Sequence, residues 1–99
     1  MTTSTFPPIV AHFRLGKVFA TPAALNALET AKVSHWDLIR RHARGDWGEV
    51  NESDRRENYD AMAYGLRILS SYALPTGERV WVITEADRSA TTLLLPEDY

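Results

Sequence analysis

Three runs rich in β-branched and aromatic residues fill the last third of this chain, and the short spacers between them strongly constrain its fold. Residues 67–74, 79–84 and 91–95 each have a composition typical of a strand. The first spacer, residues 75–78, carries Pro and Gly where tight turns use them. The second spacer, residues 85–90, is charged and rich in hydroxyl groups. Such short connections predict a three-stranded antiparallel meander.

Two helix-start signals precede this region. The pair Thr21-Pro22 predicts a short helix over roughly residues 22–32, because Thr caps free amides and Pro suits the first helical position. Ser34 is followed three residues later by Asp37, which is the spacing of a capping box. A second short helix is therefore expected after Ser34, and Gly45 ends it.

A third helix is predicted in the middle of the chain. Asn51 or Ser53 caps it, acidic residues fill its first turn, and it runs to about Gly65. The apolar side chains that we expect on its core-facing side are Tyr59, Met62, Ala63 and Leu66.

The N-terminal region completes the predicted architecture. Residues 1–8 are expected to form a flexible tail, and residues 9–99 a single domain. Side chains of different character alternate imperfectly along residues 9–20. This pattern predicts one or two short strands with a bend at Gly16. The order of elements indicates an α+β fold in which two to three short helices pack on one face of the meander.

Composition narrows the class of protein. The chain has 99 residues and no cysteine, so disulfides and thiolate metal sites are excluded. It has no apolar run of about 18 residues that would span a membrane, and its start does not read as a signal peptide, so we expect a cytoplasmic domain.

The net charge of −2 disfavours a general nucleic-acid binder, but the charge is unevenly distributed. Residues 1–44 carry six basic and two acidic side chains, whereas residues 45–99 carry five basic and eleven acidic ones. Either the two halves attract each other across the fold, or the protein has two oppositely charged faces.

The second spacer of the meander is one candidate site. In the simplest interpretation Asp87 caps backbone amides and Arg88 pairs with Glu85 on the surface. In the functional interpretation, these three side chains hold a phosphate or carboxylate beside Thr91 or Thr92. Together with a histidine, these side chains would suit metal-independent cleavage of RNA. His42 would be the general acid or the general base, Glu85 would take the remaining one of these two roles, and Arg88 would bind the phosphate. His42 also suits a hydrogen-bonded packing role, since it falls on the apolar face of its helix.

A second candidate lies in the stretch Gly45-Asp46-Trp47-Gly48, which holds a tryptophan between two glycines. Trp47, together with Asp46, is either part of an exposed binding anchor or part of a plug over one end of the core. The histidines lack the spacing of metal ligands, so the sequence predicts no metal site and no cofactor.

Three segments carry a resemblance to a known family: LGKVFATPAAL at residues 15–25, RHARGDWG at residues 41–48 and WVITEADRSATTLLLPEDY at residues 81–99. They resemble a family of short bacterial proteins called plasmid-related or hypothetical, and sometimes mislabelled as type I restriction subunits. The resemblance covers about residues 15–99 and implies a setting in bacterial mobile elements, but the family brings no established activity. The order of elements is also similar to barnase and the RelE-type toxins, which is an analogy of fold alone.

Two functional hypotheses follow. The leading one is a non-enzymatic accessory protein that binds a macromolecular partner, a protein rather than a nucleic acid, and modulates a host defence or plasmid system. An exposed strand edge would also allow a homodimer. The alternative is a small metal-independent ribonuclease of barnase-like or RelE-like architecture. The ribonuclease requires His42 and Arg88 to converge in one cleft.

Overall fold

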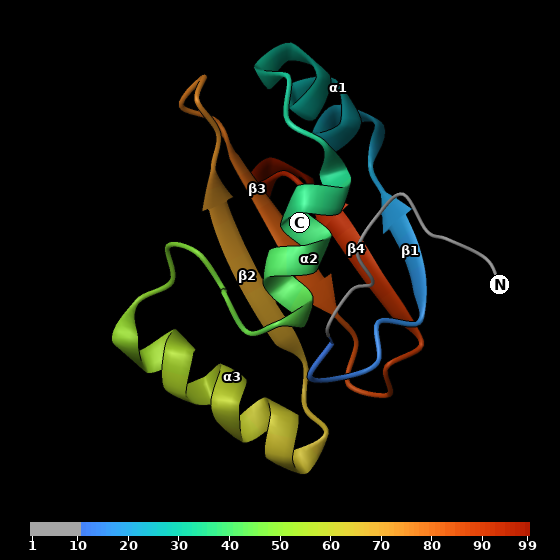
Figure 1. Ribbon diagram of the computed structural model, residues 1–99, viewed down its shortest axis with the longest axis vertical. Coiled ribbons are helices and arrows are strands. Elements are labelled where there is room, and N and C mark those ends of the chain that lie inside the picture. The colour runs from blue at the N-terminus through green and yellow to red at the C-terminus, as the bar shows by residue number, and fades with distance from the viewer. Residues whose placement is uncertain (1–10) are drawn as a thin grey trace, which may run out of the picture.

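The computed structural model of this protein describes residues 11–99 (Figure 1). The predicted tail, residues 1–8, and the first two residues of the predicted N-terminal strand region lie outside the described residues. The elements within residues 11–99 are β1 (Lys17–Ala20), α1 (Pro22–Ala31), α2 (His35–Ala43), α3 (Glu52–Tyr64), β2 (Ile68–Ala73), β3 (Arg79–Thr84), β4 (Ala90–Leu94) and the 3₁₀ turn η1 (Pro96–Asp98).

The strands form one sheet in the order β1-β4-β3-β2. β2, β3 and β4 are the predicted antiparallel meander, and the second spacer is the turn between β3 and β4. β1 adds to the sheet as a fourth strand, parallel to β4, a pairing that the sequence did not predict. Parallel neighbours need a long connection, and here the chain between β1 and β4 contains the three helices followed by β2 and β3. The predicted α+β class is confirmed.

The N-terminal strand is shorter than predicted. Within the described part of that region, only Lys17–Ala20 is a strand, and residues 11–16 are irregular. Gly16 provides the predicted bend with a φ of +65°, and a Cβ added there would collide with the carbonyl group of Ser89. This close approach sets β1 beside β4, where the Lys17 amide donates to the Ser89 carbonyl at 3.0 Å.

The helices begin at the predicted caps. Thr21, Ser34 and Asn51 each accept a hydrogen bond from a backbone amide in the first turn of α1, α2 and α3, at 2.8 to 3.2 Å. Of the two caps considered for α3, Asn51 rather than Ser53 is the one used. Gly65 ends α3 in the left-handed conformation, with a φ of +69°.

α1 and α2 lie across one face of the sheet, which we call the covered face (Figure 1). Apolar side chains of both helices pack there against the strands and form the main core. This arrangement confirms the predicted packing of helices on one face for α1 and α2. The strand residues of the covered face are Val18, Ala20, Ile68, Ser70, Tyr72, Val80, Val82, Thr84, Thr91 and Leu93.

α3 lies beside β2, and its buried side differs from the predicted one (Figure 1). Its buried residues are Asn58 and Ala61. The Asn58 side chain donates to the Leu69 carbonyl at 2.7 Å and accepts from the Leu69 amide at 3.1 Å. Because the backbone of an edge strand needs polar partners, a polar residue is buried here instead of the larger apolar ones. Of the predicted apolar side, Met62 is half-buried and Tyr59, Ala63 and Leu66 are exposed.

Candidate functional site

His42 projects from α2 into the covered face and is completely buried. Its ring nitrogens are hydrogen-bonded to two hydroxyl groups, Nδ1 to Ser70 Oγ at 2.5 Å and Nε2 to Thr84 Oγ1 at 2.8 Å. Burial, and secondarily the nearby charge of Arg88, lower the pKa of His42 from 6.5 to about 3. The imidazole is therefore neutral at pH 7.

The hydrogen bonds around His42 run in one direction. Thr91 Oγ1 donates its single proton to the Leu15 carbonyl at 2.7 Å, so it accepts from Thr84 Oγ1, also at 2.7 Å. Thr84 must then accept from His42 Nε2, which leaves Nδ1 to accept from the Ser70 hydroxyl. All four side chains are buried. Thr91, one of the predicted binding residues, is thus enclosed in this network, and the histidine directs neither a proton nor a lone pair toward solvent.

Arg88 is bound to backbone carbonyls. Its guanidinium donates to the carbonyls of Leu66 at 2.6 Å and Ala61 at 2.9 Å, at the C-terminal end of α3. It also donates to the carbonyls of Glu85 at 3.1 Å and Ala86 at 3.2 Å within its own turn. Helix C-termini carry carbonyls without helical partners and favour a cation. Arg88 therefore caps α3 and joins it to the β3–β4 turn.

The two carboxylates of the β3–β4 turn, Glu85 and Asp87, are exposed. The Ser89 amide donates to Asp87 Oδ1 at 2.9 Å. Hydrogen bonds from the side chain and then the backbone of Ser89 hold the pKa of Asp87 below its usual value. Asp87 is therefore the local cap of the simplest interpretation. Arg88, by contrast, bonds to the backbone carbonyl of Glu85 and forms no salt bridge with its carboxylate.

The three candidate catalytic groups are not brought together in one cleft. The Phe13 ring packs edge-on against His42, with the ring centroids 5.3 Å apart, and the Arg88 guanidinium lies 5.8 Å from the centre of the same Phe13 ring. Phe13 therefore contacts both groups, while the Glu85 carboxylate faces solvent. The arrangement offers no base and phosphate clamp on a shared substrate position.

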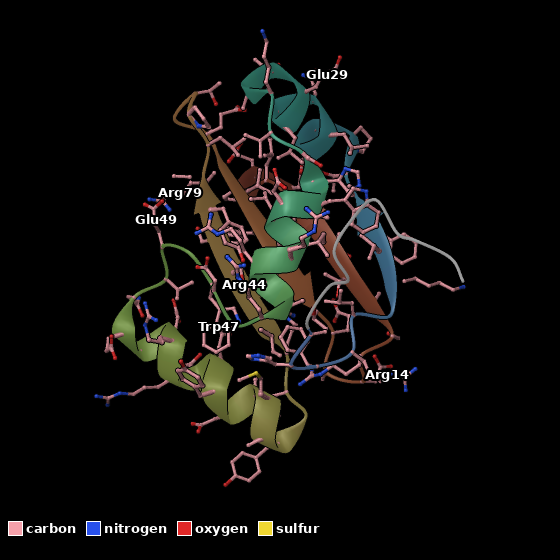
Figure 2. All side chains as sticks on the ribbon, viewed as in Figure 1. Arg14, Glu29, Arg44, Trp47, Glu49 and Arg79 are labelled. Atoms are coloured by element: carbon pink, nitrogen blue, oxygen red, sulfur yellow. The ribbon has the colours of Figure 1, made fainter. Side chains whose placement is uncertain are left out.

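Asp46 and Trp47 hold the loop between α2 and α3 in place. Asp46 accepts from Arg41 Nε at 2.7 Å, and this hydrogen bond is the main reason that the pKa of Asp46 is lowered. Trp47 is 2% exposed and packs edge-on against Tyr59, with the ring centroids 4.7 Å apart. Figure 2 shows its side chain between α3 and the sheet. Of the two alternatives for Trp47, the structure shows the plug and not the exposed anchor.

The face of the sheet opposite α1 and α2, which we call the open face, was not identified from the sequence as a site. Strand pairing defines two rows of side chains across it. The first row is Phe19, Thr92, Ile83 and Leu69, and the second is Leu94, Trp81 and Ser71. Phe19 is 53% exposed and Trp81, Leu69 and Thr92 are half-buried, whereas Ile83, Leu94 and Ser71 are buried.

An aromatic and cationic cluster lies on the open face. The Tyr99 ring packs edge-on to Trp81 at 5.8 Å between centroids, and it is 68% exposed. The Arg67 guanidinium lies 5.3 Å from the centre of the Tyr99 ring and donates to its hydroxyl. One sequence signal was available for this cluster: Trp81 stands between two buried valines, Val80 and Val82, so strand alternation directs it to the other face.

A groove of about 340 Å³ adjoins Trp81 at the β2 edge of the open face. Arg79 crosses it and donates to Ser71 Oγ at 3.3 Å and Glu49 Oε2 at 3.5 Å, so that Arg79 and Glu49 lie together in Figure 2. Asp54, at the start of α3, also lines the groove. The groove therefore combines an aromatic wall with two carboxylates, one of which is paired.

Residues 11–99 contain no group of three or more His, Cys, Asp or Glu side chains arranged to hold a metal ion. No helix in this part of the chain is both long and apolar enough to cross a bilayer. No protein-family model, curated protein or solved structure matches the chain.

Proposed function

We propose that this protein is a non-enzymatic protein-binding module and that its docking surface is the open face around Trp81 and Tyr99. The proposal rests on one observation: the sheet presents Trp81, Tyr99 and Arg67 in mutual contact on the face away from α1 and α2. Trp, Tyr and Arg are the residue types most enriched among those that dominate binding energy at interfaces. Mutual packing also limits the side-chain entropy that the cluster would lose on binding.

The positions of the candidate catalytic groups support binding rather than catalysis. His42 is neutral and enclosed, and the Arg88 guanidinium is occupied by four carbonyl groups. A general base needs access to the proton that it removes, which the enclosed His42 lacks. A phosphate clamp needs donors directed at the phosphate, whereas both Nη atoms of Arg88 donate to backbone carbonyls.

The charge beside Trp81 favours a protein partner over a nucleic acid. Exposed aromatic rings suit base stacking, and Arg67 and Arg79 lie at this surface. The carboxylates of Glu49 and Asp54 offset these two charges, so the surface has no excess positive charge for a phosphate backbone. Residues 45–99 also carry eleven acidic side chains against five basic ones. A protein segment with an apolar side chain for the groove and a Lys or Arg for its carboxylates fits this chemistry.

The resemblance to plasmid-related bacterial proteins supplies the setting for this proposal. In that setting the module is an accessory protein of a mobile element, and it modulates a host defence or plasmid system through the partner that it binds.

Site-specific photo-crosslinking in bacterial cells tests the proposal. A photoreactive phenylalanine analogue replaces Trp81 in one variant and Tyr99 in a second. The matched control carries the same analogue at Tyr64, an aromatic residue on α3 that is 78% exposed. We expect one and the same protein to be captured from positions 81 and 99 and not from position 64. Capture of RNA or DNA, or identical products from all three positions, contradicts the proposal.

A further inference from the structure

The β2 edge of the sheet is covered by the chain itself over most of its length. The backbone groups of β2 that point outward belong to Leu69, Ser71 and Ala73, the last residue of the strand. The Asn58 side chain bonds both groups of Leu69, at 2.7 and 3.1 Å. The Ser71 amide donates to the Trp47 carbonyl at 3.1 Å, and the Ser71 carbonyl accepts from the Glu49 amide at 2.7 Å. Along Leu69 and Ser71 this edge therefore offers no free backbone group to another strand, and only Ala73, at the end of β2, has outward groups without a partner within residues 11–99.

The β1 edge is built differently. The amides of Lys17 and Thr21 donate to carbonyls on the β4 side, at 3.0 and 2.9 Å. Because backbone groups alternate in direction along a strand, those of Val18 and Ala20 point away from the sheet. Within residues 11–99, β1 pairs with β4 alone, so no described strand bonds these outward groups. Figure 1 shows β1 at the margin of the sheet.

We propose that β1 of a second copy of this chain occupies this edge, antiparallel to the first and related to it by a two-fold axis through Phe19. In this register Val18 faces the partner's Ala20, and each such pair exchanges both backbone hydrogen bonds. The two Phe19 rings face each other on the open face as a non-hydrogen-bonded pair, the closer type of cross-strand neighbour.

Charge complementarity favours a second copy over an unrelated strand. In the proposed register Lys17 faces the partner's Thr21, and the Thr21 hydroxyl donates to Asp98 Oδ2 at 2.7 Å. Lys17 therefore comes close to the partner's Asp98, and the two-fold axis repeats this contact. Neither Lys17 nor Asp98 forms a salt bridge within residues 11–99. Hydrogen bonds from Thr21 and Leu95 hold the pKa of Asp98 below its usual value, so it carries its charge at pH 7.

The side chains of β1 also suit a partner. Val18 is 37% exposed and Phe19 is 53% exposed. Natural edge strands are usually protected by lysines, prolines or bulges along their length. Here Lys17 is the single charge in β1, and it stands at the first position. A strand of another protein would satisfy the outward backbone groups but would lack the reciprocal contact between Lys17 and Asp98.

This inference goes beyond the proposed function, because it concerns the β1 edge and a copy of the same chain. A two-fold axis perpendicular to the sheet keeps the open faces of both copies on one side. The dimer would present two Trp81 clusters on one continuous sheet, and a partner with two copies of its binding segment would be held at both.

Analytical ultracentrifugation of the wild type and of two variants with opposite charges at position 19 tests the dimer. At concentrations up to about 100 μM we expect the wild-type mass to rise from 11.2 kDa, the mass of one chain, to twice that value. Phe19→Asp and Phe19→Lys, each alone, place like charges opposite each other and should remain at the mass of one chain. An equimolar mixture of the two variants should recover the doubled mass, because opposite charges then meet across the axis.

Two further variants separate pairing from folding. Val18→Pro removes an amide that points outward, so it should keep the native circular dichroism spectrum and lose the dimer. Tyr64→Lys, a matched change on α3, should keep the dimer. A wild-type protein that stays at 11.2 kDa overturns the inference, as does a Phe19 mixture that stays monomeric. These readouts do not depend on the protein captured from Trp81, so either proposal can fail alone.

Discussion

On the covered face of the sheet the polar side chains are enclosed and paired, whereas on the open face large aromatic side chains reach the surface. Thr84 and Thr91 lie beneath α2 and complete their hydrogen bonds through His42. Trp81, on the same strand as Thr84, packs against a tyrosine that is mostly exposed. A fully satisfied polar network is stable inside a core, while aromatic rings left at the surface are available to a partner. In this chain, residue type alone is therefore a poor guide to which face a side chain occupies.

Replacing the tryptophan buried beneath α3 and the tryptophan on the open face should give the largest difference in stability. Trp47→Ala removes a fully buried ring from the cluster beneath α3 and should lower the free energy of unfolding by about 4 kcal/mol. Trp81→Ala, on the open face, should lower it by about 1 kcal/mol, because the ring is only half-buried. Urea denaturation of both variants measures the difference. Equal losses would show that the open face is part of the core.

Two glycines, one packed against β2 and one exposed at the end of α3, allow a second comparison of an enclosed with an open position, with a smaller expected effect on stability. Gly48 and Gly65 have nearly the same φ, +70° and +69°. A Cβ at Gly48 would collide with the Ser71 carbonyl and lie 2.6 Å from Cδ1 of Tyr72, whereas a Cβ at Gly65 meets nothing within 4 Å.

The two alanine variants separate backbone strain from lack of space. Gly65→Ala carries the strain alone and should lower the free energy of unfolding by about 1 kcal/mol. Gly48→Ala adds the collision at the closed β2 edge and should lower it by about 3 kcal/mol. Thermal and urea unfolding measure both values. Similar losses for the two variants would mean that the loop at Gly48 moves freely away from β2.

The enclosed His42 should make the free energy of unfolding depend on pH. The unfolded chain binds a proton at His42 near pH 6.5, while the folded protein does so only near pH 3. Unfolding therefore takes up a proton in this interval. Above pH 6.5, His42 does not reduce the free energy of unfolding. As the pH falls from 6.5 toward 3, proton uptake by the unfolded chain lowers this free energy by about 1.4 kcal/mol per pH unit.

Comparison with His42→Gln isolates this contribution from that of the carboxylates. Between pH 6 and pH 4 the free energy of unfolding of the wild type should fall more steeply than that of the variant. Chemical denaturation at a series of pH values gives both slopes, and parallel slopes would contradict a neutral, enclosed His42.

Local chemistry made several elements predictable. The caps Thr21, Ser34 and Asn51 act within one turn of their own helices, and the turn residues between β2, β3 and β4 act within a few residues. These interactions are short in sequence, so their consequences can be read from it. The α+β class and the meander followed from them.

The candidate site was less predictable, because each of its residues depends on a distant contact. Trp47 is buried by α3, and Thr91 is covered by the Leu15 segment that lies 76 residues away in sequence. Arg88 bonds to the end of α3, which no local pattern indicates. The prediction of the apolar side of α3 was wrong for the same reason, because the residue that α3 buries against β2 is Asn58, which bonds the backbone of Leu69.

Propensity, capping and turn geometry are properties of neighbouring residues, so the order of the amino acids is enough to specify which segments become helices and strands and where the chain turns. The parallel addition of β1, the difference between the two edges of the sheet, and the exposure of the aromatic and titratable side chains arise only when the chain folds. These depend on contacts between residues far apart in the chain, such as Gly16 with Ser89 and Asn58 with Leu69. Local pattern does not encode such contacts, because many partners could satisfy the same backbone group.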